Sequence, residues 1–228
     1  MATESRIAHA LRATDNGDMT SPGAEARIPA PSAGWAGAAM AVRAVQLSSA
    51  PLLLTLGIAD TGTVLIDFRH RTYDGVLSAA RLPVDPASVS IETHPTFPGA
   101  PLPFPAPGAE LDALLWHIGY HAFPETVAPW MPESGRFRLA RWPNLSDLPI
   151  SLDHVRMTAM LGNGYASAAE LAATAGVELA VARSTLNAFG VVGILRGAPE
   201  ATPEAPLDPA PVAQSRGLFA RLRDRLGF

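Results

Sequence analysis

The stretch between residues 149 and 195 constrains the fold most, because capping residues and glycines divide it into short helices with defined ends. Ser151 is a favourable N-cap for a first helix, which Gly162-Asn163-Gly164 would end. Ser167 and Glu170 have the S-x-x-E spacing of a capping box, and a second helix is predicted to start there and to stop at the next glycine. This part of the chain is therefore predicted to be helical, with tight turns.

A third helix is predicted over Glu178–Phe189, ended by Gly190 and followed by a β-like run over Val191–Leu195. This order of elements resembles a winged helix-turn-helix module: a helix, a tight turn, a second helix and a glycine-ended strand. It is carried by the sequence YASAAELAATAGVELAVARSTLNAFGVVGIL. The resemblance covers about 47 of the 228 residues and contains no catalytic motif. The resemblance is to a superfamily and not to a single protein. It implies DNA binding, with the third helix in the major groove.

If that implication holds, the base contacts would come from polar side chains of the third helix: Arg183, Ser184, Thr185 and Asn187. The span 149–196, however, contains three arginines and three acidic residues, and is electrically neutral. Binding to nucleic acid depends strongly on neutralising phosphates, and a neutral module lacks this contribution. We therefore expect the module to dock proteins, with nucleic acid as the disfavoured partner.

Residues 35–145 are predicted to form a small α+β domain. Leu52–Ile58 and Thr63–Phe68 are β-favouring runs, joined where Asp60 can start a turn and a following glycine can supply positive φ. This predicts a hairpin. Ser88–Thr93 alternates apolar and polar side chains and predicts a third strand.

Two helices and a proline-rich loop complete this predicted domain. Helices are expected over Trp35–Ser49 and Glu110–Phe123, the second from apolar residues at helical spacing. The loop 95–108 holds six of the 22 prolines, and since proline lacks the N–H used in ladders and helices, we expect an extended surface segment. Arg136–Trp142 alternates basic and apolar side chains, as in a half-exposed strand.

The complete prediction is an α+β protein in which a small N-terminal domain with a hairpin and a helix precedes a winged-helix-like domain over 146–196. Residues 1–34 are expected to be a flexible arm, since they have few large apolar side chains. Residues 197–213 have the composition of a proline-rich linker. Residues 214–228 are expected to form a tethered amphipathic helix.

The C-terminal helix is the expected partner-binding element. Its apolar stripe and the flanking basic residues comprise Leu218, Phe219, Leu222, Leu226, Arg221 and Arg225. From 214 to 228 there are four basic residues and one acid, in a chain of net charge −4. Docking on a partner protein is favoured; an anionic membrane surface and a nucleic acid are the alternatives. The sequence does not predict whether the chain forms homo-oligomers.

Composition excludes several enzyme classes. All 17 basic residues are arginine, and there is no cysteine. Schiff-base enzymes, Walker-A nucleotidases and protein kinases need a lysine amine, while thiolate catalysis, Cys-ligated zinc, iron–sulfur clusters and disulfides need cysteine. No cofactor is expected. Without a signal peptide, or an apolar run near the ~20 residues of a membrane span, we expect a cytoplasmic protein.

Two patterns suggest enzymatic or metal chemistry, each with a simpler interpretation. Asp60-Thr61-Gly62 resembles the Asp-Thr-Gly of aspartic proteases, but there is no second copy in the chain, and a homodimer would have to supply the paired carboxylate. A hairpin turn explains the same residues. His117 and His121, at i and i+4, are weak candidates for zinc ligands without a third ligand nearby, and partly buried, hydrogen-bonded histidines are favoured.

These observations favour a non-enzymatic bacterial regulatory or adaptor protein that acts through protein–protein interaction. The first alternative is a DNA-binding transcriptional regulator that uses the winged-helix-like domain. The second is an aspartic-type hydrolase that uses Asp60 in a homodimer.

Overall fold

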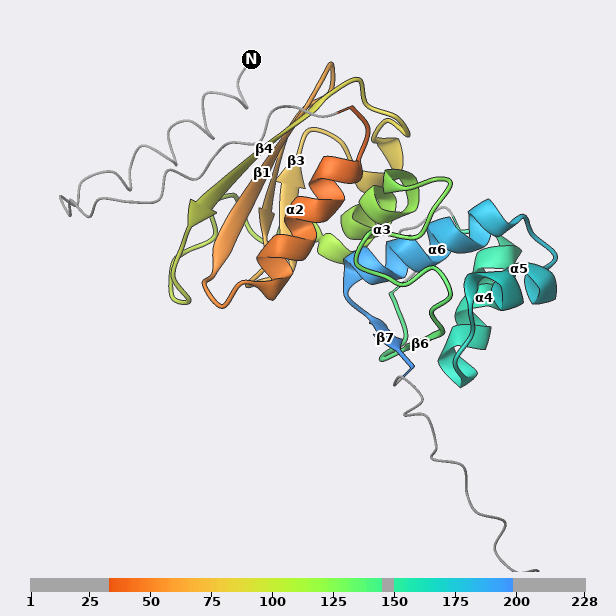
Figure 1. Cartoon of the computed structure of the whole chain (residues 1–228). Coiled ribbons are helices and arrows are strands. Elements are labelled where there is room, and N and C mark those ends of the chain that lie inside the picture. Colours follow the sequence, from red (N-terminus) through yellow and green to blue (C-terminus); the bar gives the residue numbers. More distant parts are fainter. Residues whose placement is uncertain (1–32, 145–149, 199–228) are drawn as a thin grey trace, which may run out of the picture. The chain divides into compact units, whose positions relative to one another are not determined.

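The predicted hairpin lies within a five-stranded antiparallel sheet of an α+β fold, in a computed structural model that describes residues 33–144 and 150–198 (Figure 1). All of these residues fall in one compact unit that ends at Ala198. The elements are, in chain order, α2 (Ala36–Leu47), β1 (Leu52–Ile58), β2 (Gly62–Asp67), β3 (Thr72–Gly75), a 3-10 turn (Ala79–Arg81), β4 (Val89–Pro95), β5 (Ala109–Glu110), α3 (Leu111–Ala122), β6 (Phe137–Leu139), α4 (Leu152–Asn163), α5 (Ala168–Ala175), α6 (Leu179–Val192) and β7 (Leu195–Gly197).

The sheet has the strand order β4-β1-β2-β3-β5. β1 pairs with β2 so that Leu54 lies opposite Ile66. The turn between them has positive φ at Gly62 (119°), as the sequence predicts, and also at Asp60 (57°). The predicted third strand is β4, which pairs with β1 on the other side of the hairpin. β3 was missed because its sequence, TYDG, contains two residues that disfavour strands.

Alternate side chains of the sheet enter different environments. Leu54, Leu56 and Ile66 are buried among side chains of α2 and α3, on the face that these helices cover (Figure 1). Leu53 and Leu65 point to the other face, where they pack against Phe104 from the proline-rich loop. This loop has no helix or strand over residues 96–108, yet it buries an aromatic side chain and thereby covers part of the sheet.

An ion pair at the end of β2 anchors the same loop. Asp67 is fully buried and accepts a hydrogen bond from the Arg69 Nη2 at 2.5 Å. Arg69 also donates to the carbonyl oxygens of Phe97 (2.6 Å) and Ala100 (3.2 Å). Burial alone raises the pKa of Asp67, but hydrogen bonds from Arg69 and His70 outweigh it and lower the pKa below its usual value.

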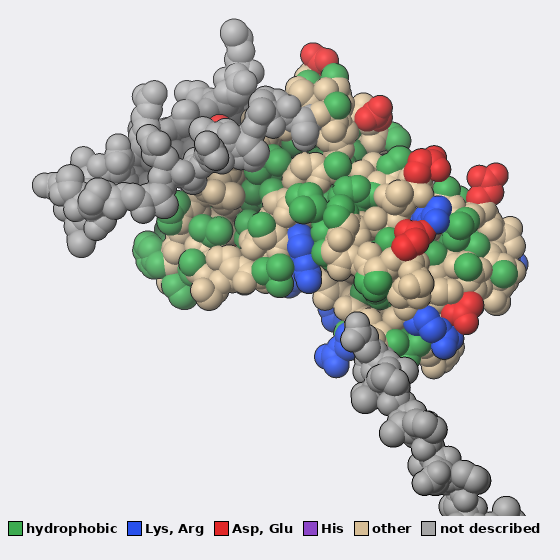
Figure 2. Space-filling view, viewed as in Figure 1, with side chains coloured by type: hydrophobic (Ala, Val, Ile, Leu, Met, Phe, Trp, Pro, Cys, Tyr) green, Lys and Arg blue, Asp and Glu red, His purple; other side chains and the backbone are tan. Residues whose placement is uncertain are grey.

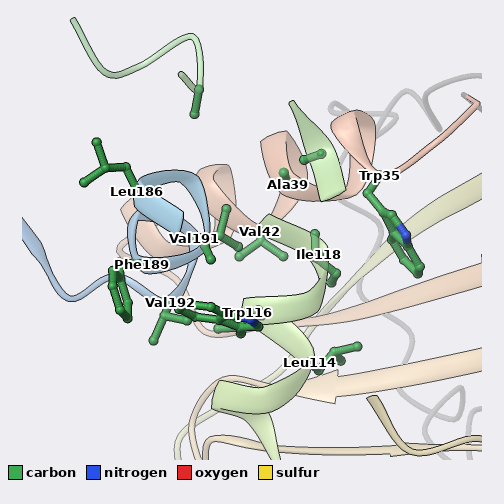
Figure 3. Close-up of a cluster of buried hydrophobic side chains, with 14 of the residues drawn as sticks. Trp35, Ala39, Val42, Leu114, Trp116, Ile118, Leu186, Phe189, Val191 and Val192 are labelled. Carbon is green, nitrogen blue, oxygen red and sulfur yellow. The ribbon is translucent and has the colours of Figure 1, made fainter. Parts of the chain in front are cut away.

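The core continues from the sheet through α3 to α6. A Cβ on Gly119 of α3 would lie 2.7 Å from the Cα of Ala188 in α6, so only glycine permits this close approach of the two backbones. Beside this crossing Trp116 meets Phe189 edge to face at 4.8 Å, and the surrounding apolar side chains of α2, α3 and α6 point toward one another (Figure 3). The predicted boundary at residues 145/146 lies in the segment that is not described, and separate folding of two domains stays a prediction.

The helices after this boundary begin as predicted, but the last one ends later. Ser151 and Ser167 both cap their helices, and Glu170 completes the second capping box. The prediction that Gly190 ends the third helix is wrong: α6 continues to Val192 and ends at Gly193, with φ of 82°. Gly190 lies inside α6, the left-handed residue that ends the helix is Gly193, and the strand is correspondingly shifted to β7.

Candidate functional site

The side chains of α6 that were predicted to contact bases are buried or form contacts within the chain. Arg183 donates from Nη1 to the carbonyl of Glu125 at 2.9 Å and forms an ion pair with Glu133. Ser184 and Thr185 are buried, and the Thr185 hydroxyl donates to a carbonyl one turn earlier in the helix. None of these three side chains projects into solvent as a freely available polar group.

Asn187 is the most constrained of the four. It is fully buried, and its Oδ1 accepts from the N–H of Ala128 at 2.7 Å. Its Nδ2 donates to the carbonyls of Phe123 (3.1 Å) and Thr126 (2.8 Å). One amide thus organises the loop that follows α3. DNA reading by these α6 side chains stays a prediction, and each base contact would have to replace a hydrogen bond of the folded chain.

Asp60 lies in the turn between β1 and β2, where its side chain is exposed. The positive φ of this residue and of the following glycine is the geometry of a tight hairpin turn. The simpler interpretation therefore accounts for Asp60 without catalysis, and the hydrolase alternative stays a prediction.

His117 and His121 line a small cavity of about 210 Å³ between α3 and α4, together with Trp116, Tyr120 and His154. His117 Nε2 lies 3.1 Å from the carbonyl of Pro83, within hydrogen-bonding distance for the Nε2–H tautomer. Burial lowers the pKa of all three histidines, and the nearby His117 contributes to lowering that of His121 to about 4. The rings are therefore neutral at physiological pH.

Neutral imidazoles are good metal ligands, and a metal site needs several of them, or carboxylates, to converge. Within residues 33–144 and 150–198 no group of three or more His, Cys, Asp or Glu side chains has the arrangement needed to hold a metal ion. The partly buried, hydrogen-bonded state expected as the simpler interpretation is what His117 shows. The cavity is smaller than the ~300 Å³ typical of ligand sites, and aromatic edges fill its wall.

An exposed apolar surface that the sequence analysis did not identify lies on α2. One side of this helix packs on the sheet and on α3, while the opposite side carries apolar residues at i, i+4, i+8 and i+11: Ala36, Met40, Ala44 and Leu47. Met40 is 47% exposed and Leu47 68% exposed. Figure 2 shows hydrophobic side chains and few charged ones over this part of the surface.

Arg43 is the one charged residue of α2, and it lies between Met40 and Leu47 on the outward side. Its Nε is buried and has no hydrogen-bond partner among the described residues. Beside it a cavity of about 250 Å³ extends toward β7, lined also by Trp130, Met131 and Leu195. The outward face of α2 therefore combines exposed apolar side chains with one cation that lacks a counterion in the described structure.

A signal for this surface was present in the sequence. AGAAMAVRAVQL has one charged residue in twelve, and a helix that is apolar all round is normally covered on all sides. The predicted partner-binding residues of the tail, from Leu218 to Leu226, lie outside the described residues.

No protein-family model matches the chain, and comparison with curated proteins and with solved structures finds no similar protein. Across the described part of the chain, no helix combines the length and the apolar character needed to cross a membrane.

Proposed function

We propose that this chain is a non-enzymatic adaptor that docks a partner protein, and that the outward face of α2, formed by Met40, Ala44, Leu47 and Arg43, is the docking surface. The observation that carries the proposal is the exposure of two large apolar side chains on either side of a buried, unpartnered guanidinium nitrogen. Apolar surface with an aligned charge gains free energy when a partner covers both.

The occupant we propose is an amphipathic helix of another protein, with apolar residues on one side and a carboxylate aligned with Arg43. Two helices pack through apolar residues spaced three and four positions apart on each, which matches the spacing of Met40, Ala44 and Leu47 on α2. A second copy of this chain is the less favourable occupant. Arg43 is close to the middle of the helix, so pairing two α2 helices would bring two guanidinium groups together.

The roles expected for the other regions remain part of this proposal. The winged-helix-like module of α4, α5 and α6 and the amphipathic segment 214–228 would be further docking elements. The internal hydrogen bonds of Asn187 and Arg183 support the adaptor over a transcriptional regulator that reads DNA with α6.

The test is a selection from a displayed library of helical peptides against the full chain. We expect enrichment of peptides with an apolar stripe and an Asp or Glu at a fixed position. Against Arg43→Glu the same library should enrich Lys or Arg at that position. Leu47→Ser should weaken binding of the selected peptides by more than about tenfold, because it removes the most exposed large apolar side chain of the docking surface.

Leu152→Ser is the matched control, since Leu152 is 64% exposed on α4 and undergoes the same change in polarity. Peptide affinity should be unchanged in this variant. The proposal fails if no peptide is enriched, or if the enriched peptides bind Arg43→Glu and Leu47→Ser as well as the unmodified chain. Sedimentation analysis that finds a dimer broken by Leu47→Ser would overturn the choice of occupant.

A further inference from the structure

The short sheet of β6 and β7 places two arginines side by side. The strands pair antiparallel, with Arg138 directly opposite Arg196 and with Leu139 opposite Leu195. Phe137 and Leu139 are buried on the inner face, while Arg138 and Arg196 are exposed on the outer face. Side chains directly opposite in such a pair have Cβ atoms about 4.5–5.5 Å apart, so the two cations repel each other.

Neighbouring arginines are neutralised, but these two are not. Arg136 forms an ion pair with Glu170 at 3.0 Å, and Arg141 forms one with Asp112 at 3.0 Å. Within the described ranges no acidic side chain pairs with Arg138 or Arg196. In Figure 2 several arginine side chains lie along the lower part of the visible surface and others lie near its middle, whereas most acidic ones lie along its upper and right edges. An anion between the two guanidinium groups would turn their repulsion into attraction.

Aromatic rings adjoin this pair. The guanidinium of Arg138 lies over the ring of Tyr165, 5.1 Å from its centroid. Arg136 donates to the Tyr165 carbonyl at 2.9 Å and so helps to hold this residue in position. Trp142 is 59% exposed and lies against Gly162, three residues before Tyr165. Tyr165 is thus in contact with one of the two unneutralised cations, and Trp142 offers an exposed ring four residues after Arg138 in the chain.

We propose that the outer face of β6 and β7 binds single-stranded nucleic acid, with a backbone phosphate between Arg138 and Arg196 and an unpaired base stacked on Trp142. This is a binding activity beyond the proposed docking of a protein on α2. Arginine pairs phosphate oxygens through its planar fork, and aromatic rings stack on any base without regard to sequence. An acidic peptide would satisfy the arginines but would leave the exposed indole unused.

The dimensions of the face favour a single strand over a duplex. Each strand has three residues, which span about 10 Å and match two or three nucleotides. Bases become available for stacking only when they are unpaired. Reading a groove of duplex DNA would need a longer exposed basic element, and α6 is buried over most of its length.

The experiment is fluorescence anisotropy of the full chain with labelled single-stranded DNA and RNA of about 15 nucleotides, over about 20 to 200 mM NaCl. We expect binding that weakens with salt. In the double variant Arg138→Gln/Arg196→Gln the affinity at low salt should fall at least about tenfold, and the salt slope should decrease by about 0.7, the value for the one phosphate that the two arginines hold. Trp142→Leu should weaken binding while leaving the slope unchanged.

Arg81→Gln is the matched control, because Arg81 is an exposed arginine on the 3-10 turn and its loss changes the net charge by one. It should leave affinity and salt slope nearly unchanged. The thermal midpoint of the double variant should change little, since relief of the repulsion offsets the lost contact of Arg138 with Tyr165, and this separates loss of binding from loss of folding.

Several outcomes would overturn the proposal. They are no binding at low salt, equal losses in Arg81→Gln and in the double variant, or tighter binding to duplex DNA than to the single strand. Equal affinity for a poly-glutamate peptide, with the same dependence on both arginines, would identify an acidic polypeptide as the ligand and reject nucleic acid.

Discussion

α2 and α6 are similar in sequence and different in environment. Both are rich in alanine and valine, and each contains a single arginine. α6 is buried from Ser184 to Val192, and Arg183 pairs with Glu133 and with a backbone carbonyl. α2 is buried on one side only. The Nε atoms of both arginines are buried without a partner, but Arg43, unlike Arg183, forms no ion pair among the described residues. Composition therefore does not decide which of two apolar helices becomes the centre of a core and which is left with an open face.

The difference comes from the neighbours that each helix acquires. α3 crosses α6 closely at Gly119, and the loop after α3 is tied to α6 by Asn187. On α2 the sheet and α3 occupy one side, and a single hydrogen bond from Gln46 to the Val191 carbonyl, at 2.7 Å, reaches α6. We therefore expect substitutions in α6 to lower the stability of the fold, and substitutions on the outward face of α2 to weaken partner binding.

The largest effect on folding is expected for Asn187→Ala. Removing the amide leaves one buried N–H and two carbonyls without their partner, which should lower the free energy of unfolding by about 3 kcal/mol. Urea denaturation of the full chain measures it. Asn163→Ala, at an exposed amide in α4, is the control and should change stability by less than about 0.5 kcal/mol. Similar losses in both variants would contradict the role assigned to Asn187.

A smaller effect is expected from acid, on the α3 side of α6. Burial, followed by the charge of His117, lowers the pKa of His121 to about 4 in the folded chain, against about 6.5 unfolded. The unfolded state therefore binds more protons between these values, and stability is full above about pH 6.5 and decreases as the pH falls toward about 4.

The loss assigned to His121 should be about 1 to 2 kcal/mol, a value discounted because the ring is only half buried. Unfolding in urea at about pH 7.5 and pH 4.5 measures the difference. His121→Gln should reduce this dependence relative to the unmodified chain. An equally steep dependence in the variant would show that other groups cause it.

A smaller difference in stability is expected between substitutions of Arg183 and of Arg43. Arg183→Ala removes a charge-assisted contact that is partly exposed and should cost about 1 kcal/mol, whereas Arg43→Ala should change stability by less than about 0.5 kcal/mol. Thermal denaturation of both variants provides the comparison. Equal losses of stability in the two variants would mean that Arg43 contributes to folding, and would contradict its assignment to the docking surface.

The smallest effect on folding is expected for Leu47→Ser. Leu47 is mostly exposed, and its loss should alter the free energy of unfolding by less than about 0.5 kcal/mol. The same variant should lose affinity for the selected helical peptides. A large loss of stability, measured by urea denaturation, would place this side chain in the core and remove it from the docking surface.

Local sequence signals predicted most of the elements but few of the contacts between them. The hairpin at Asp60 and Gly62 and the capping box of Ser167 and Glu170 were predictable, since each depends on residues only a few positions apart. The end of α6 was not, because Gly190 and Gly193 are both possible helix ends in the sequence, and only in the folded chain does Gly193 take the left-handed conformation. The burial of Asn187 was not predictable either, because its three hydrogen-bond partners lie about 60 residues earlier in the chain.

The sequence alone therefore determined the α+β class, the turns, the caps and the absence of chemistries that need lysine or cysteine. Only the tertiary structure decided which charges meet. Counted along residues 149–196 the charges cancel, but β6 comes from upstream of that span and brings Arg138 against Arg196. Local structure follows from neighbours in the chain, whereas a binding surface depends on side chains that only folding brings together, since electrostatic and apolar contacts act over distances in space.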